Sequence, residues 1–267
     1  MSGGRVSSIL KRVYVGLILL FLYAPIIVLI VFSFNASRSR GRWGGFTLSW
    51  YAEMFRDRQI MGALWNTVAI AVLSAALAGI LGTASAIGIN AMKKIPRKIM
   101  LTANNLPVLN PDIVTGVSLM ILFIFVFNTL RAGSLGFLTM LLAHVAFNAP
   151  YVILSVLPKL SGLDPNMYEA ALDLGCRPAP AFFKVILPEI SQGIISGVVL
   201  AFTLSIDDFV ISFFTKGPGF SNLSIIVYSM ARRGVNPKIN AVSTLIFVTV
   251  MLLLALVNKL NGEKLKS

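Results

Sequence analysis

Charged residues are scarce in this chain of 267 residues. They make up 12% of the chain, whereas hydrophobic residues make up 57%. A water-soluble domain usually carries about 25% charged residues, and half of that share cannot cover a soluble surface of this size. The composition therefore excludes an ordinary cytosolic enzyme and a disordered protein, and it indicates a chain that lies mostly in lipid.

Cysteine and histidine are almost missing, since Cys176 and His144 are the single residues of their types. An intramolecular disulfide is therefore impossible, and a zinc site built from Cys and His ligands is excluded. The sequence also lacks the phosphate-binding pattern Gly-x-x-x-x-Gly-Lys-Ser/Thr. We expect a chain that is not itself an enzyme, with no catalytic or metal-binding residue and no cofactor of its own.

Six apolar runs reach the length of about 20 residues that a helix needs to cross the hydrocarbon core. No repeat or low-complexity linker interrupts them. They predict an all-α polytopic membrane protein with six transmembrane helices, organised as a single domain over residues 1–267. The runs are Val13–Phe34, Leu64–Met92, Ile99–Asn128, Leu135–Leu157, Val185–Phe214 and Ile239–Val257.

Basic residues outnumber acidic residues by 23 to 10. Because they lie between the apolar runs, we interpret them as membrane-flanking anchors and not as nucleic-acid contacts. With the N-terminus inside, thirteen of them fall in inside segments and ten in outside segments. The dense cluster at residues 93–98, Lys-Lys-Ile-Pro-Arg-Lys, lies in a very short loop and favours cytoplasmic N- and C-termini.

Small and aromatic residues add two expectations. Small residues recur every four positions in the second and fifth runs, which predicts a tightly packed bundle because such faces let helix backbones approach closely. Four aromatic residues in or next to the first outside segment are expected to be interfacial anchors, although Trp50 and Tyr51 can instead meet an external binding protein. The small residues are Ser74, Ala78, Gly82, Ala86, Gly193, Gly197, Ala201 and Ser205; the aromatic residues are Trp43, Trp50, Tyr51 and Trp65.

The inside segment 158–187 carries helix-capping residues that an unstructured loop does not need. Asp164 is suited to an N-cap, Pro165 to the first helical position and Gly175 to the position after a helix. A second short helix is expected from Pro178 toward Pro188. The capped hairpin is either a connection on the membrane surface or a docking element for a cytoplasmic partner. The apolar side of its first helix consists of Tyr168, Ala171, Leu172 and Leu174.

Within this segment, Glu169-Ala170-Ala171 is followed after three residues by Gly175, and after nine more by Val185-x-Leu187-Pro188. The pattern resembles the EAA signature of ABC importer permeases, with Val185 in place of the usual Ile. The resemblance implies that this loop is the coupling helix, which is seated in a groove of an ATPase subunit. The coupling residues that it implies are Glu169, Ala170, Ala171, Asp173, Gly175, Leu187 and Pro188.

Other segments, among them Asn110-Pro111-Asp112 and Ser205-Ile-Asp207-Asp208, are similar to the spermidine/putrescine branch of these permeases. The resemblance implies a type I ABC importer transmembrane domain in the cell membrane that translocates polyamines by alternating access. The partners that it implies are an ATPase dimer carrying ATP and Mg, a second permease subunit that makes a heterodimer, and an external polyamine-binding protein. Membrane lipid is expected around the chain, and nucleic acid is not.

Three carboxylates, Asp112, Asp207 and Asp208, lie within apolar runs, where a charge costs about 2.5–3.5 kcal/mol or more unless it has a partner. On a continuous helix, Asp208 falls on the small-residue face and Asp207 about 100° away. The three are candidates for a path that receives the ammonium groups of a polyamine. The alternatives are a helix-end cap or an ion pair for Asp207 and Asp208, and a cap for Asp112. His144 is either a satisfied buried histidine or a proton relay.

Three rival functions stay open. An ion-gradient-driven secondary transporter of small cations also needs membrane carboxylates, but it needs no capped cytoplasmic element, and inverted repeats are expected for it. An ABC importer permease for a different substrate shares the hairpin but not the acidic motifs. A membrane-embedded enzyme requires a nucleophile–base pair, and the sequence offers only the lone His144.

The orientation can be tested with single cysteines introduced after Cys176 has been replaced. A cysteine at Lys94 should react with an impermeant thiol reagent only from the cytoplasmic side, and one at Arg40 only from outside. The opposite labelling pattern would contradict the cytoplasmic N-terminus, and with it the assignment of segment 158–187 to the inside.

Overall fold

The computed structural model describes residues 3–37, 42–131, 133–164, 166–233 and 237–263, with side chains from residue 10 to residue 252. Pro165 and Arg40, which carry two of the expectations above, lie outside the described residues. The chain forms two compact units. The terminal unit comprises Met1–Met61 and Val227–Ala255, and the central unit comprises Gly62–Ile226 and Leu256–Ser267.

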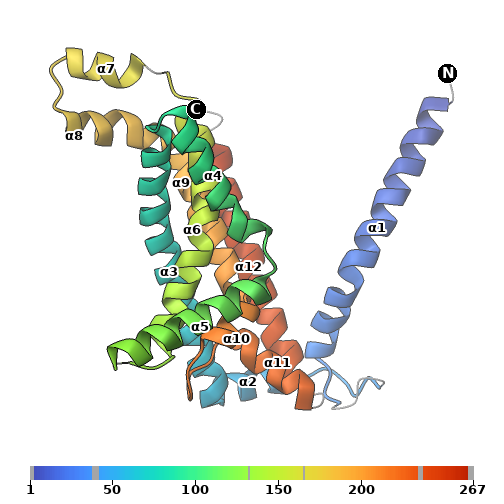
Figure 1. Cartoon of the computed structure of the whole chain (residues 1–267). Coiled ribbons are helices and arrows are strands. Elements are labelled where there is room, and N and C mark those ends of the chain that lie inside the picture. Colours follow the sequence, from blue (N-terminus) through green and yellow to red (C-terminus); the bar gives the residue numbers. More distant parts are fainter. Residues whose placement is uncertain (1–2, 38–41, 132, 165, 234–236, 264–267) are drawn as a thin grey trace. The chain divides into compact units, whose positions relative to one another are not determined.

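The central unit is helical along nearly all of its described length (Figure 1), which confirms the predicted all-α class. Two of its helices, α3 and α11, extend into the terminal unit. The helices are α3 (Arg58–Asn90), α4 (Lys94–Leu109), α5 (Asp112–Leu130), α6 (Phe137–Ser161), α7 (Asn166–Asp173), α8 (Pro178–Ala181), the π-helical turn η1 (Phe182–Ile186), α9 (Leu187–Asp207), α10 (Val210–Thr215) and α11 (Leu223–Arg233).

Helix α6 is buried along most of its length and packs closely against α3 and α9. Glycines make this approach possible. A Cβ added at Gly197 would lie 3.0 Å from Val152 Cα, and one added at Gly82 would lie 2.7 Å from Val152 Cβ. Gly193 is equally tight against the backbone of α6. The predicted small-residue faces are therefore confirmed as contact surfaces between helices.

The third apolar run, predicted as one span over Ile99–Asn128, is two helices. Helix α4 ends at Leu109, Asn110 and Pro111 are extended, and α5 begins at Asp112. The expectation of a single helix was wrong because Pro111 lacks a backbone N–H and keeps the preceding residue out of the α-region.

The fifth run, predicted as one helix over Val185–Phe214, is also divided into two helices. Helix α9 ends at Asp207, Asp208 is extended with φ −60° and ψ 123°, and α10 begins at Val210. At its other end, the second short helix of the hairpin is not separate, because α8, η1 and α9 form one helical run of 30 residues from Pro178 to Asp207. Figure 1 shows that this run turns sharply between α8 and α9.

The terminal unit holds α1 (Gly3–Ser33), α2 (Ser49–Arg56), the start of α3 and most of α12 (Lys238–Glu263). An isolated β-bridge joins Asn35 to Phe46. Trp50 is 6% exposed and its indole N–H donates to Asn35 O at 2.7 Å. Trp50 is thus a core residue of this unit, and both roles expected for it, interfacial anchor and external contact, are wrong. Lys238 Nζ lies 3.3 Å from Glu53 Oε2.

Five described helical segments are long and apolar enough to cross a membrane. The described part of the sixth predicted span, Lys238–Leu252, is apolar but shorter, and the side chains of the rest of α12 lie outside the described residues. A multi-pass membrane protein is therefore supported. The five segments are Leu10–Ser33, Arg58–Asn90, Asp112–Leu130, Phe137–Ser161 and Pro178–Asp207.

The close approach of α6 and α9 predicts a specific sensitivity to added volume. Gly197→Ala should lower the stability of the purified protein by about 1–3 kcal/mol, because the new methyl group would press on the Val152 backbone. The matched control is Gly88→Ala in α3, where nothing lies within 4 Å of the added Cβ. Thermal unfolding in detergent measures both changes, and equal midpoints for the two variants would contradict the packing argument.

Candidate functional site

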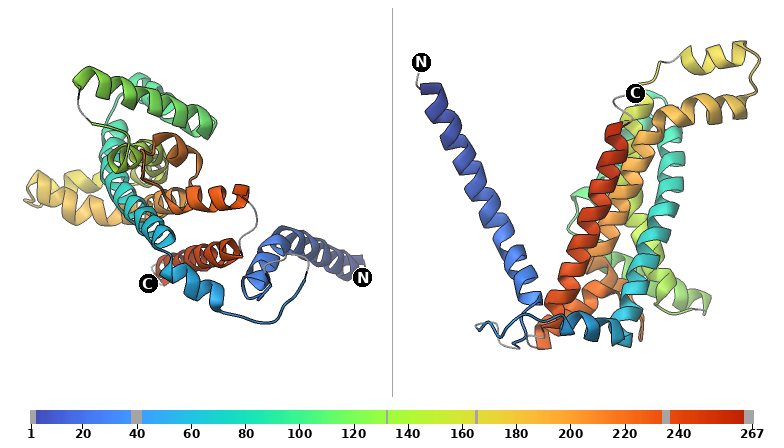
Figure 2. Two further views of the ribbon diagram at one scale, coloured as in Figure 1. Left: turned by 90° about the horizontal axis from the view of Figure 1, so that it is seen from below. Right: turned by 180° about the vertical axis from the view of Figure 1, so that it is seen from behind.

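The hairpin of α7 and α8 projects from one end of the central unit (Figures 1 and 2). Asp164 Oδ1 accepts the N–H of Asn166 at 2.9 Å where α7 begins. At the other end, Gly175 has φ +86°, its N–H donates to Leu172 O, and the Cys176 N–H donates to Ala171 O. This is the Schellman arrangement, which needs a left-handed residue after the helix. The predicted caps at Asp164 and Gly175 are confirmed.

The signature residues divide between two surfaces. Glu169, Ala170, Asp173 and Gly175 are exposed on the hairpin, whereas Ala171 is 6% exposed and packs inward. The other two signature residues lie elsewhere, at the start of α9: Leu187 packs beside the main core cluster and Pro188 is exposed.

Leu174 does not lie on the apolar side of α7 that was expected for it. It is 87% exposed, because it stands at the end of the helix where the chain turns away. Phe183, in the π turn, is also 62% exposed. Large apolar side chains are thus exposed on the hairpin and in the π turn, and helical periodicity alone could not single them out.

The π turn η1 lies where the hairpin passes into α9. The Leu187 N–H donates to Phe182 O, five residues back, and the next residue is Pro188, which has no N–H to donate. A wide turn before a proline accommodates the missing hydrogen bond and bends the helix. The sequence signal for this bend is Pro188, which was assigned to the signature but not to the bend.

The second group of candidate residues surrounds the break between α9 and α10. The Asp208 carboxylate accepts the backbone N–H groups of Ile211 at 3.2 Å and Ser212 at 2.7 Å, which makes it the cap of α10. His144 Nε2 lies 3.5 Å from Asp208 Oδ2. The continuous helix assumed in the projection ends at Asp207, yet the expected outcome holds: Asp208 faces the packed interior with its side chain 7% exposed, whereas Asp207 is exposed.

His144 is fully buried, and its Nδ1 donates to Met140 O at 2.8 Å. Its Nε2 therefore points toward Asp208 and toward Ser212 Oγ at 3.4 Å. Asn222 Nδ2 donates to Ser212 Oγ at 2.8 Å and to Asp208 O at 3.2 Å. This network ties α6, the helix break and the start of α11 together.

Asp207 differs from its neighbour. Its side chain is exposed, and among the described residues no basic side chain lies within ion-pair distance of its carboxylate. Asp112 is also exposed, at the first position of α5. One helical turn later, Gly116 lies against Ile211 and Val210, so Asp112 lies one turn of α5 away from a contact with α10.

Sequence reasoning missed a buried polar cluster that joins α3, α6 and α9. Asn148 Nδ2 donates to Ser205 Oγ at 2.7 Å, and Ser205 Oγ lies 3.0 Å from Ser74 Oγ. All three side chains are at most 1% exposed. Ser74 and Ser205 were assigned to close packing only; the signal for the cluster is an asparagine within an apolar run.

Comparison with known proteins places this arrangement in a family. Residues 78–265 match the family of binding-protein-dependent transport system inner membrane components. The chain belongs to this family. It is 42% identical over 235 residues to the putrescine transport system permease protein PotI of Escherichia coli K12, a match that covers 86% of this chain and 83% of that protein.

Two further relatives of this inner-membrane component carry one name, spermidine/putrescine transport system permease protein PotC. The protein of Escherichia coli K12 is 34% identical over 261 residues, with 98% of this chain and 97% of that protein covered. The protein of Haemophilus influenzae is 36% identical over 247 residues, with 92% and 94% covered. The predicted membership of the ABC permeases with polyamine permeases as relatives is confirmed.

Solved structures show the same fold. A subunit of a bacterial ABC transporter involved in the import of the acidic polysaccharide alginate superposes with a TM-score of 0.72 at 18% identity, covering 98% of this chain and 99% of that one. The alginate transporter in complex with a periplasmic protein bound to an alginate pentasaccharide gives a TM-score of 0.76 at 17% identity, with 98% and 97% covered. At these identities the likeness shows the fold of an ABC importer transmembrane subunit and not its substrate.

Proposed function

We propose that this permease subunit imports polyamines, with putrescine and spermidine as the substrate class, in an ABC importer of the cell membrane. The observation that carries the proposal is the identity of 34–42% with polyamine permeases along most of the chain. The exposed carboxylates beside the α9–α10 break support it, because a flexible polycation needs spaced negative charges. The chain itself binds no cofactor in this proposal and performs no chemistry.

The energy comes from a separate ATPase dimer that binds ATP and Mg. The hairpin of α7 and α8 is the element that docks on it. Support comes from the exposure of Glu169, Asp173 and Leu174 and from the firm cap at Gly175. Because α8 continues through η1 into α9, a displacement of the hairpin reaches the residues of the helix break along one helical run.

Of the two neighbouring carboxylates, only one belongs to the substrate path. The Asp208 carboxylate accepts two backbone N–H groups of α10 and lies 3.5 Å from His144 Nε2 in the packed interior, so its charge serves the helix break. Asp207 is exposed and lacks a basic partner among the described residues, which makes it the carboxylate that receives an ammonium group.

The remaining partners follow from the arrangement of such importers. A second permease subunit completes the path, and an external binding protein delivers the polyamine. Both termini are cytoplasmic, as the basic cluster at 93–98 favours. The resemblance to the alginate transporter in complex with its periplasmic protein supports a binding-protein partner at the level of the fold.

Uptake by the assembled importer in proteoliposomes tests the function. Labelled spermidine should enter only when ATP is enclosed on the ATPase side, and an ion gradient without ATP should drive none. Asp207→Asn should raise the spermidine concentration for half-maximal uptake by about tenfold, since a hydrogen bond to a charged group contributes about 1.5–3 kcal/mol.

Asp208→Asn and His144→Ala are the matched comparison in the same assay. They should lower the maximal rate without the tenfold change in half-saturation, because both residues position the break and do not meet substrate. Unchanged uptake in both aspartate variants would make the pair structural. Uptake driven by an ion gradient alone would favour a secondary transporter.

Gly175 offers a graded test of coupling. Its φ of +86° is costly for a side chain, by about 1–2 kcal/mol for most residues and more for a β-branched one. Gly175→Val should insert normally but lose uptake while the ATPase still hydrolyses ATP, whereas Gly175→Asn should keep most of the coupling because asparagine tolerates this conformation. Normal uptake by the valine variant would remove the hairpin from the coupling role.

A further inference from the structure

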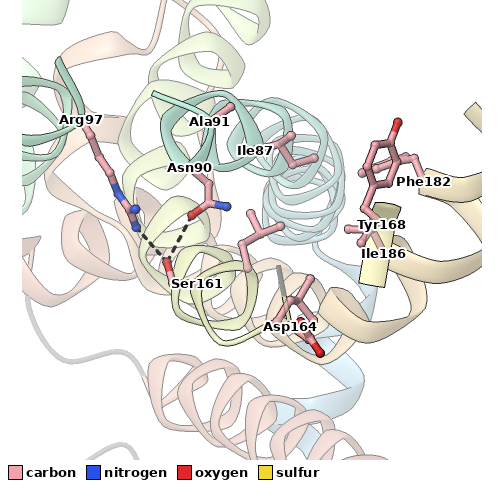
Figure 3. A pocket seen from close by; sticks show the side chains of 11 residues that line it. Ile87, Asn90, Ala91, Arg97, Ser161, Asp164, Tyr168, Phe182 and Ile186 are labelled. Atoms are coloured by element: carbon pink, nitrogen blue, oxygen red, sulfur yellow. Dashed lines mark hydrogen bonds between the residues drawn. The ribbon is translucent and has the colours of Figure 1, made fainter. Parts of the chain in front are cut away.

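A cavity of about 510 Å³ lies in the central unit between the hairpin and the ends of the long helices. Its walls come from the last turns of α3 and α6, from α4, from α7 and from the π turn (Figure 3). Neither the carboxylates of the helix break nor the exposed signature residues line it. The proposed transport function thus leaves this cavity without a role.

One end of the cavity is polar and positively charged. Arg97 Nη2 donates to Ser161 Oγ at 2.8 Å, and Ser161 Oγ donates to Asn90 Oδ1 at 3.3 Å. Figure 3 shows these three side chains converging at one end of the cavity. Within the described part of the chain, Arg97 forms no ion pair, so most of the five N–H donors of its guanidinium remain available.

The opposite end is apolar and aromatic. Ile87, Ile186 and Phe182 line it, with Tyr168 beside them (Figure 3). The single carboxylate in the wall belongs to Asp164, and its Oδ1 is engaged by the Asn166 N–H. The cavity therefore suits a ligand with an anionic group at the Arg97 end and an apolar body at the Phe182 end.

The basic side chains around the cavity favour a ligand of negative charge. Four exposed lysines, Lys93, Lys94, Lys98 and Lys159, lie at the same helix ends as Arg97. A basic pocket at the membrane surface between helices is the arrangement that binds anionic lipid headgroups. The positions of these residues, where α3 and α6 end and α4 begins, put the cavity at the level of the headgroups.

We propose that this cavity binds an anionic phospholipid, with the phosphate on the guanidinium of Arg97 and the amide nitrogen of Asn90, and the acyl chain on the apolar wall. The bound lipid fills the space behind the hairpin and steadies it against the ends of α3 and α6. The proposal requires only that the helices lie in a membrane, so it is independent of the identity of the transported substrate.

Lipid retention by the detergent-purified, assembled importer tests the proposal. The complex is equilibrated with vesicles of phosphatidylglycerol and phosphatidylcholine in equal amounts, purified again and analysed by native mass spectrometry. Arg97→Gln should lower the retained ratio of phosphatidylglycerol to phosphatidylcholine by more than about tenfold, because it removes the fork that binds a phosphate. The matched control, Lys98→Gln, removes the same charge from outside the cavity. It should lower the retained ratio of phosphatidylglycerol to phosphatidylcholine by about fivefold or less.

Competition separates the lipid from smaller anions. Short-chain dihexanoyl-phosphatidylglycerol should displace the retained lipid, whereas glycerol phosphate and inorganic phosphate should not, because they lack the apolar body. Displacement by inorganic phosphate would overturn the lipid assignment and make the site a phosphate site. Equal losses in Arg97→Gln and Lys98→Gln would overturn the proposal altogether, since the basic residues would then act as diffuse surface charge. Neither result depends on polyamine uptake.

Discussion

Backbone hydrogen bonding governs the central unit, because the bilayer core offers no water to an unpaired N–H or C=O group. Where a helix stops inside the apolar region, side chains must take over. Asp208 accepts the first N–H groups of α10, while Asn222 donates to the carbonyl of Asp208 and accepts the N–H of Ile225. The course of α10 and the start of α11 depend on these few polar contacts.

The features that the sequence predicts well are those that residue type alone determines. Apolar run length locates the spans, and Asp164 and Gly175 locate the ends of α7, because each residue type has one favoured place at a helix end. Small residues at every fourth position indicate the faces of α3 and α9 on which α6 packs. The EAA pattern supplies the family, since its residues occur at fixed offsets.

The helix breaks and polar contacts could not be predicted in the same way. An apolar run shows that a segment lies in lipid, but it does not show where the helix ends when a carboxylate can cap the next one. Asp208 was therefore treated as part of a continuous helix, although α9 ends at Asp207. Its partner His144 is 64 positions away in the sequence, and the Ser74–Asn148–Ser205 cluster joins three helices. Such pairings depend on tertiary packing, which local pattern does not encode.

Asp207 and Asp208 are neighbours in the chain, yet a helix end separates their surroundings: one side chain is exposed and the other is enclosed by His144, Ser212 and the backbone of α10. In the proposed import function, the demands of folding and of cargo recognition therefore rest on different residues. A substitution at the exposed position can alter which cation is carried while the scaffold stays intact. This division leaves the permease free to change its substrate range over evolution without first compensating for lost stability.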